Sequence, residues 1–129
     1  MTMTKEQKDL LFADLCGRLP YGVKCEDIYG NIGELVGIEP FNSVTLKISE
    51  KSNWIIDLDN IKPFLLPLSS MSEEQREEYN DLKDNDGYSF DANGNIFTLQ
   101  DFFNKYHLDY RHLILNKSMA IDATGLNIY

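Results

Sequence analysis

The chain has 129 residues, the size of one ordinary domain, and its hydrophobic content of 43% is too high for a disordered protein. Its 21 acidic and 12 basic residues leave a net charge of -9. A chain this acidic is not expected to bind nucleic acid directly or to dock on an anionic membrane, because both interactions need basic residues.

The N-terminal residues MTMTKEQKDLL lack the basic start and the apolar run of a signal peptide. No apolar stretch approaches the ~18 residues that a membrane-spanning helix needs. Cys16 and Cys25 are the only cysteines. We therefore expect a cytoplasmic protein with no membrane contact, in which both cysteines are reduced, buried thiols.

The first predicted element is a helix. Thr4 and Gln7 form a capping-box pattern, in which each side chain satisfies the other residue's free amide. Apolar residues then recur at helical spacing and form one stripe: Leu11, Phe12, Leu15, Cys16 and Leu19. Because Pro20 cannot continue a helix, the pattern predicts a helix over residues 5–18.

Residues 21–68 change to the alternating pattern of strands. The clearest strand has Val44, Leu46 and Ile48 alternating with polar residues. Further strands are predicted over 23–26, 32–38 and 54–56, followed by a helical turn over 57–63 and a last strand over 64–68 whose flanking prolines suit a sheet edge. Four to five short strands predict a small antiparallel sheet or barrel. A helical turn before the final strand resembles the order of elements in Tudor-like small β-barrels.

Residues 72–129 are predicted to be mainly helical. Ser72 with Gln75 begins an acidic helix that extends to about residue 83, and segments 88–91 and 95–98 are able to pair around Asn93-Gly94, a favoured hairpin turn. Thr98 with Asp101 begins another helix, which is predicted to resume over 110–116 after an interruption at 107–109. The pattern predicts one α+β domain over 1–129, with the C-terminal helices packed on the sheet.

Charge is concentrated between residues 73 and 91. This stretch has eight carboxylates against Arg76 and Lys83, a net charge of -6 out of the -9 of the chain. Such a helix is most often a solvated surface. The alternative is an interaction face for a basic protein, or a mimic of the phosphate backbone, formed by Glu73, Glu74, Glu77, Glu78 and Asp81.

The segment around Asp91 partly resembles a calcium-binding loop. Aligning Gly94 with the invariant glycine of such loops places Asp91 in a fitting position. The first ligand position then falls on Ser89 and the last on Gln100, so the two strongest anionic ligands are missing. The hairpin turn is therefore the favoured interpretation.

Two histidines flank an aspartate in the segment KYHLDYRHLI. His107, Asp109 and His112 are residue types that bind zinc, but a spacing of five residues does not place both imidazoles on one face of a helix. We predict no metal site here. Asp109 is instead expected to cap a new helical turn, with His112 exposed or bonded to the backbone.

No catalytic signature accompanies the cysteines or serines, and Asp57 with Asp59 is one of many carboxylate pairs. We predict no catalytic residue and no cofactor, and a small enzyme with an unrecognised site is one alternative. Exposed aromatic residues would define another class of site, a groove for a peptide or a cationic side chain. The candidates for its lining are Tyr21, Tyr29, Phe41, Trp54 and Phe64.

Several segments resemble uncharacterised small proteins of gut anaerobic bacteria and their phages or mobile elements: LCGRLPYGVKC, IKPFLLPLSSMSEEQREEY, HLDYRHLI and AIDATGLNIY. This resemblance implies a bacterial cytosolic setting, related to phages or mobile elements, and no particular activity. The expected function is therefore a non-catalytic interaction with another protein. An acidic inhibitor or nucleic-acid mimic acting on a basic partner is the first alternative.

Overall fold

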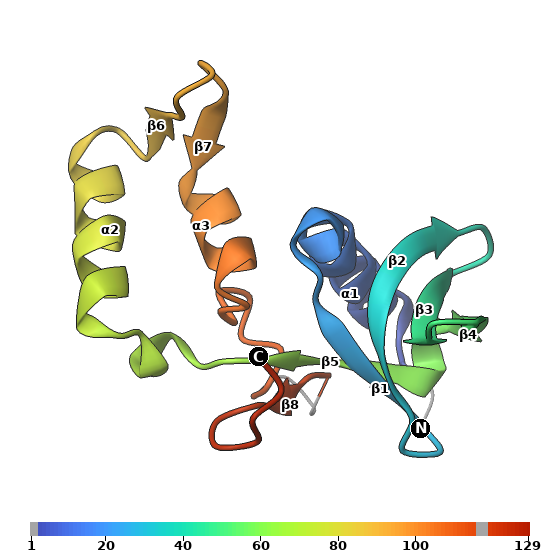
Figure 1. The fold of residues 1–129 in the computed structure, drawn as a ribbon. Helices are drawn as coiled ribbons and strands as arrows, with labels where there is room; N and C mark the ends of the chain where they lie inside the picture. The colour runs from blue at the N-terminus through green and yellow to red at the C-terminus, as the bar shows by residue number, and fades with distance from the viewer. Residues whose placement is uncertain (1–2, 116–118) are drawn as a thin grey trace.

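The computed structural model describes residues 3–115 and 119–129, and it shows an α+β fold (Figure 1). Its elements follow in this order: α1 (Lys5–Arg18), η1 (Leu19–Tyr21), β1 (Lys24–Asp27), β2 (Ile32–Glu39), β3 (Ser43–Ser49), β4 (Ser52–Asp57), η2 (Leu58–Asn60), β5 (Ile61–Leu65), η3 (Leu68–Ser70), α2 (Glu73–Asp84), β6 (Tyr88–Phe90), β7 (Ile96–Thr98), α3 (Leu99–Lys105) and β8 (Ile121–Asp122). Elements η1, η2 and η3 are single 3-10 turns.

The main sheet has six strands in the order β4-β3-β2-β1-β5-β8, which is more than the four to five that the sequence predicts. Strands β1 to β4 form an antiparallel meander, and β5 returns after η2 to pair with β1. The short strand β8 lies parallel to β5. The described strands thus form an open, mixed sheet with β4 and β8 at its edges. The predicted last strand is wrong in one respect, because β5 lies inside the sheet and not at an edge.

Helix α1 begins and ends as its sequence predicts. Thr4 Oγ1 accepts a hydrogen bond from Gln7 N at 3.2 Å, and Thr4 N donates to Gln7 Oε1 at 2.9 Å. The buried face, however, includes Asp14 and Arg18 besides the leucines, and Cys16 is exposed. The prediction of two buried thiols is therefore wrong for Cys16. Since the buried face includes these two polar residues, it is rotated away from the apolar stripe that the spacing suggests.

Asp14 and Arg18 form an ion pair that is completely buried. Arg18 Nε lies 2.7 Å from Asp14 Oδ2, and both side chains are 0% exposed. Arg18 Nη2 donates to the carbonyl of Leu108 at 2.7 Å, and Arg111 Nη1 lies 3.0 Å from Asp14 Oδ1. These contacts connect α1 to the segment that follows α3. Removing one member of such a pair leaves an unpaired charge buried in the interior.

The hydrophobic core has two parts. The larger cluster lies between α1 and the sheet and includes Leu11, Leu15, Val44 and Leu46, all fully buried. The smaller cluster joins α2 and α3 through Leu82, Phe102 and other side chains, and α3 in turn contacts α1. In Figure 1, α3 lies between α2 and the part of the molecule that contains α1 and the sheet.

The C-terminal half confirms the local predictions and corrects one of them. Capping boxes at Ser72 and Thr98 begin α2 and α3, and β6 and β7 pair around the predicted hairpin turn. Residues 110–115 form turns instead of the predicted resumed helix. The carboxylate of Asp109 accepts hydrogen bonds from Leu113 N and Ile114 N at 2.7 and 2.9 Å, and the positive φ of His112, 58°, interrupts a helical path. Residue 116 of that prediction lies outside the described residues.

Candidate functional site

The turn between β1 and β2 is held rigidly by Asp27. Its carboxylate accepts hydrogen bonds from Tyr29 N at 2.8 Å, Asn31 N at 2.9 Å and Asn31 Nδ2 at 3.0 Å. Burial alone would raise the pKa of Asp27, but the hydrogen bonds from Asn31 and Tyr29 outweigh burial and lower that pKa. Asp27 is therefore ionised at neutral pH. The turn that it fixes leaves Ile28 61% exposed and Tyr29 83% exposed.

Opposite this turn lies β4, an edge strand with apolar side chains in solvent. Trp54 is 43% exposed and Ile55 is 69% exposed. A hollow of about 340 Å³ lies between the two elements, lined by Ile28, Tyr29 and Trp54 together with Ile55, Ile56, Asp57, Asp27 and Asn60. Contiguous exposed apolar side chains rimmed by polar ones are typical of an interaction site.

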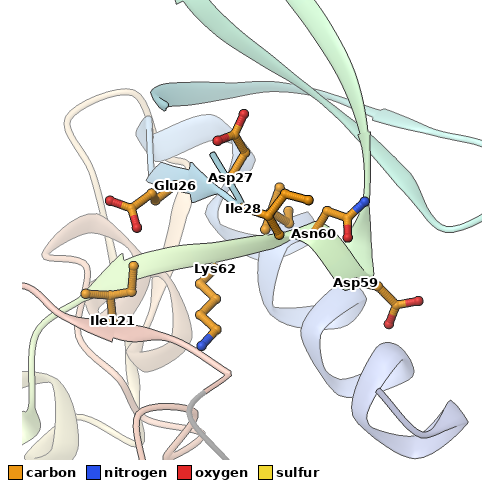
Figure 2. Close-up of a pocket in the computed structure, with 8 residues that line it drawn as sticks. Glu26, Asp27, Ile28, Asp59, Asn60, Lys62 and Ile121 are labelled. Carbon is orange, nitrogen blue, oxygen red and sulfur yellow. The ribbon is translucent and has the colours of Figure 1, made fainter. Parts of the chain in front are cut away.

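A second hollow, of about 420 Å³, adjoins the first and shares Asp27, Ile28 and Asn60 with it. It is lined in addition by the end of β1, the residues from η2 into β5, and Ile121 of β8. Figure 2 shows Asp59 turned toward α1 and Lys62 pointing away from Asp27. We refer to the two hollows together as the acidic groove.

The lining of the acidic groove has four carboxylates and one lysine: Glu26, Asp27, Asp57, Asp59 and Lys62. The negative charge of Asp59 is partly compensated, because its carboxylate accepts a hydrogen bond from Met3 N at 2.9 Å and lies 3.2 Å from Lys8 Nζ. These contacts, the bond from Met3 first, lower the pKa of Asp59. Asp27 and Asp57 line the same hollow as Tyr29 and Trp54, and carboxylates beside aromatic rings are suited to a cationic ligand.

The acidic residues predicted from the sequence lie elsewhere. Glu73, Glu74, Glu77 and Asp81 are exposed on α2, whereas Glu78 is half-buried and accepts a hydrogen bond from Tyr106 Oη at 2.7 Å. In Figure 1, α3 and α1 lie between α2 and strand β4. The protein therefore has two separate acidic surfaces, and the α2 carboxylates do not extend the groove.

The structure brings together two of the five predicted aromatic residues. Tyr29 and Trp54 line the acidic groove. Phe41 is 92% exposed but does not line it, Phe64 is 2% exposed in the interior, and Tyr21 donates a hydrogen bond to Asp101 at 3.3 Å. Sequence reasoning missed Ile28 and Ile55. An available signal was that both directly adjoin an aromatic candidate.

The residues weighed as metal ligands make other contacts in the structure. Asp91 uses its carboxylate within the β6–β7 turn, where it accepts hydrogen bonds from Asn93 N at 2.8 Å and Asn95 N at 2.9 Å. The ring of His107 stacks on Tyr129, and His112 is exposed. Within residues 3–115 and 119–129, no three His, Cys, Asp or Glu side chains form a group able to hold a metal ion.

No protein-family model, curated protein or solved structure matches the chain. Among the described residues, no helix has the length and apolar character needed to cross a bilayer.

Proposed function

We propose that the protein is a non-catalytic interaction domain whose acidic groove binds a basic segment of another protein. The observation that supports this proposal is the hollow in which Tyr29 and Trp54 lie together with Asp27 and Asp57. The resemblance noted above suggests a bacterial, cytoplasmic setting connected with phages or mobile elements, and that setting forms part of the proposal.

The groove offers two kinds of attraction to an arginine or lysine side chain. The aromatic faces of Tyr29 and Trp54 provide cation–π contacts, worth about 0.5–2 kcal/mol depending on how far the cation is desolvated. The carboxylates add an electrostatic attraction that weakens with salt, since the hollow is open to solvent. Ile28 supplies apolar surface for the aliphatic part of the bound side chain.

Trp54 is the single tryptophan and lines the hollow, so its fluorescence reports directly on the groove. The test is a titration with an acetylated, amidated nonapeptide of alternating arginine and threonine, and with its glutamate counterpart. The arginine peptide should change the Trp54 emission, with an affinity that falls as salt rises, and the glutamate peptide should not. Equal responses to both peptides, or no response to either, would contradict the proposal.

A pair of variants separates the groove from general surface effects. Tyr29→Ala removes one aromatic face from the hollow and should weaken binding about 5–30-fold, which corresponds to the upper part of the cation–π range. Phe90→Ala is the matched control, because Phe90 is also exposed, at 63%, but lies on β6 and does not line the groove. Equal losses in the two variants would place binding outside the groove.

The acidic surface of α2 is a second candidate. Its support is that Glu73, Glu74 and Glu77 all lie exposed along one rigid, capped helix, as an acidic inhibitor or nucleic-acid mimic requires. In this case, changing all three to glutamine would abolish binding to a basic DNA-binding protein, and Tyr29→Ala would have no effect. The opposite pattern would support the groove.

A further inference from the structure

Among the described residues, strand β4 has one long side without a partner strand. It pairs with β3 on one side only and lies at the edge of the sheet. The unpaired N–H and C=O groups of an exposed edge strand are a template for pairing with another chain. Proteins that keep such an edge commonly use it to bind an extended segment.

The hydrogen-bonding pattern identifies which residues of β4 face outward. Leu58 N donates to the carbonyl of Asn42 at 2.9 Å, one residue beyond the pair Ser43–Asp57. Hydrogen-bonded and non-bonded pairs alternate along an antiparallel ladder. Asp57 and, two residues away, Ile55 are therefore in non-bonded pairs, and their N–H and C=O groups point away from β3.

The two faces of β4 also differ. Trp54 lies opposite Leu46, which is completely buried, so the two side chains share the inner face of the sheet. The side chain of Ile55 lies on the outer face, beside that of Thr45. A strand added along β4 would therefore direct every second side chain toward the hollow between Trp54 and Tyr29.

We propose that the occupant of the acidic groove binds as an additional β-strand along β4, with alternate basic side chains entering the hollow. This inference rests on the proposed function and specifies its mode of binding. Charge complementarity identifies the occupant as a basic segment of another protein, because the groove has four carboxylates and one lysine. A second copy of this chain, with its net charge of -9, would be repelled.

The first test uses the alternating arginine–threonine nonapeptide in three forms: unmodified, N-methylated at every threonine, and N-methylated at every arginine. In an added strand, only every second N–H points at β4. One methylated peptide should therefore lose about tenfold or more in affinity, while the other keeps the affinity of the unmodified peptide. Loss with N-methyl-threonine indicates an antiparallel strand, and loss with N-methyl-arginine a parallel one.

Equal affinities of the two methylated peptides, whether both are retained or both are lost, would overturn strand addition and leave the proposed function standing. Failure of the unmodified peptide to bind would overturn both. Dimerisation of the protein through β4, detected by sedimentation, would likewise overturn the inference, because the edge would then be occupied by a second copy.

The second test changes β4 itself. Ile55→Pro removes an N–H that points away from β3, a position where an edge strand tolerates proline. Ile55→Ala is the control, since it keeps that N–H and shortens the side chain. Ile55→Pro should lose about tenfold or more in peptide affinity and Ile55→Ala much less, and equal losses would overturn the inference. Should Ile55→Pro fail to fold, slowed amide exchange at Ile55 and Asp57 of the unchanged protein on peptide binding decides the same question.

Discussion

Acidification is predicted to weaken the fold through His107. Burial of the imidazole, together with the positive charges of Arg18 and Lys24, lowers the pKa of His107 from 6.5 to about 4. Its ring stacks on Tyr129 with the centroids 3.7 Å apart, and its Nδ1 is buried without a hydrogen-bond partner among the described residues. Between about pH 6.5 and about pH 4, the imidazole of His107 therefore stays neutral in the folded protein, whereas a free histidine is protonated.

The sign and size of the effect follow from proton linkage. Because the pKa of His107 is lower in the folded than in the unfolded state, the unfolded state binds the extra proton first. Its contribution is fully present above pH 6.5 and is lost as the pH falls toward about 4. With the full pKa shift of His107, the free energy of unfolding falls by about 2 kcal/mol between about pH 7 and about pH 5. Solvent screening of the partly exposed ring reduces this to about 1 kcal/mol.

The assay compares urea unfolding at these two pH values for the parent, His107→Phe and His112→Phe. His107 and His112 have nearly the same left-handed backbone, with φ of 57° and 58°, so the backbone cost of the substitution is matched. The free energy of unfolding of His107→Phe should fall by about 1 kcal/mol less than that of the parent on acidification. His112→Phe is the control for the effect of the substitution on the backbone. An identical pH dependence of all three proteins, or an NMR titration of His107 near its ordinary pKa, would refute the reasoning.

Three further predictions concern stability. Asp14→Asn should cost about 3–5 kcal/mol in urea unfolding because it leaves Arg18 buried without its counter-charge, and a loss below about 1 kcal/mol would mean that the pair is not isolated from water. Asp27→Ala should lower the unfolding free energy by about 1–3 kcal/mol. Asp91→Ala should lower it by less, because Asp91 makes the corresponding hydrogen bonds in an exposed turn. Equal thermal unfolding midpoints of the two variants would contradict this. Tyr129→Phe should cost about 1–3 kcal/mol because its hydroxyl donates to the Phe64 carbonyl and accepts from Lys24 N, and an unchanged denaturation midpoint would show that water replaces both bonds.

The elements that the sequence predicts well are those determined by neighbouring residues. The capping pair Thr4 and Gln7 begins α1 in the structure as in the pattern, and Ser72 does the same for α2. The hairpin around Asn93-Gly94 likewise needs only its own residues, because the φ of Gly94, 81°, suits the turn. Local hydrogen bonds and backbone preferences are sufficient at these places.

The features that the sequence did not predict depend on distant partners. Strand β8 exists because Ile121 pairs with Phe64 across more than fifty residues, and no local pattern indicates this pairing. The predicted burial of Cys16 is wrong because Arg18 is buried on another side of α1, where it donates hydrogen bonds to Asp14 and to the carbonyl of Leu108. A buried ion pair resembles a solvated helical pair when only its spacing is known.

The acidic residues of α2 are close together in the sequence, whereas those of the groove are close together only in the fold. The carboxylates of the groove come from two separate segments, Glu26 with Asp27 and Asp57 with Asp59, and neither segment is conspicuous among 21 acidic residues. They lie together because η2 returns the chain to β1 and the β1–β2 turn presents Tyr29 opposite β4. A field is set by the distances between charges and by the low-dielectric walls around them, not by their order in the chain. On α2 the exposed carboxylates are surrounded by water, whereas Asp27 and Asp57 line the same hollow as Tyr29 and Trp54. That difference in surroundings favours the groove over α2 as the binding surface in the proposed function.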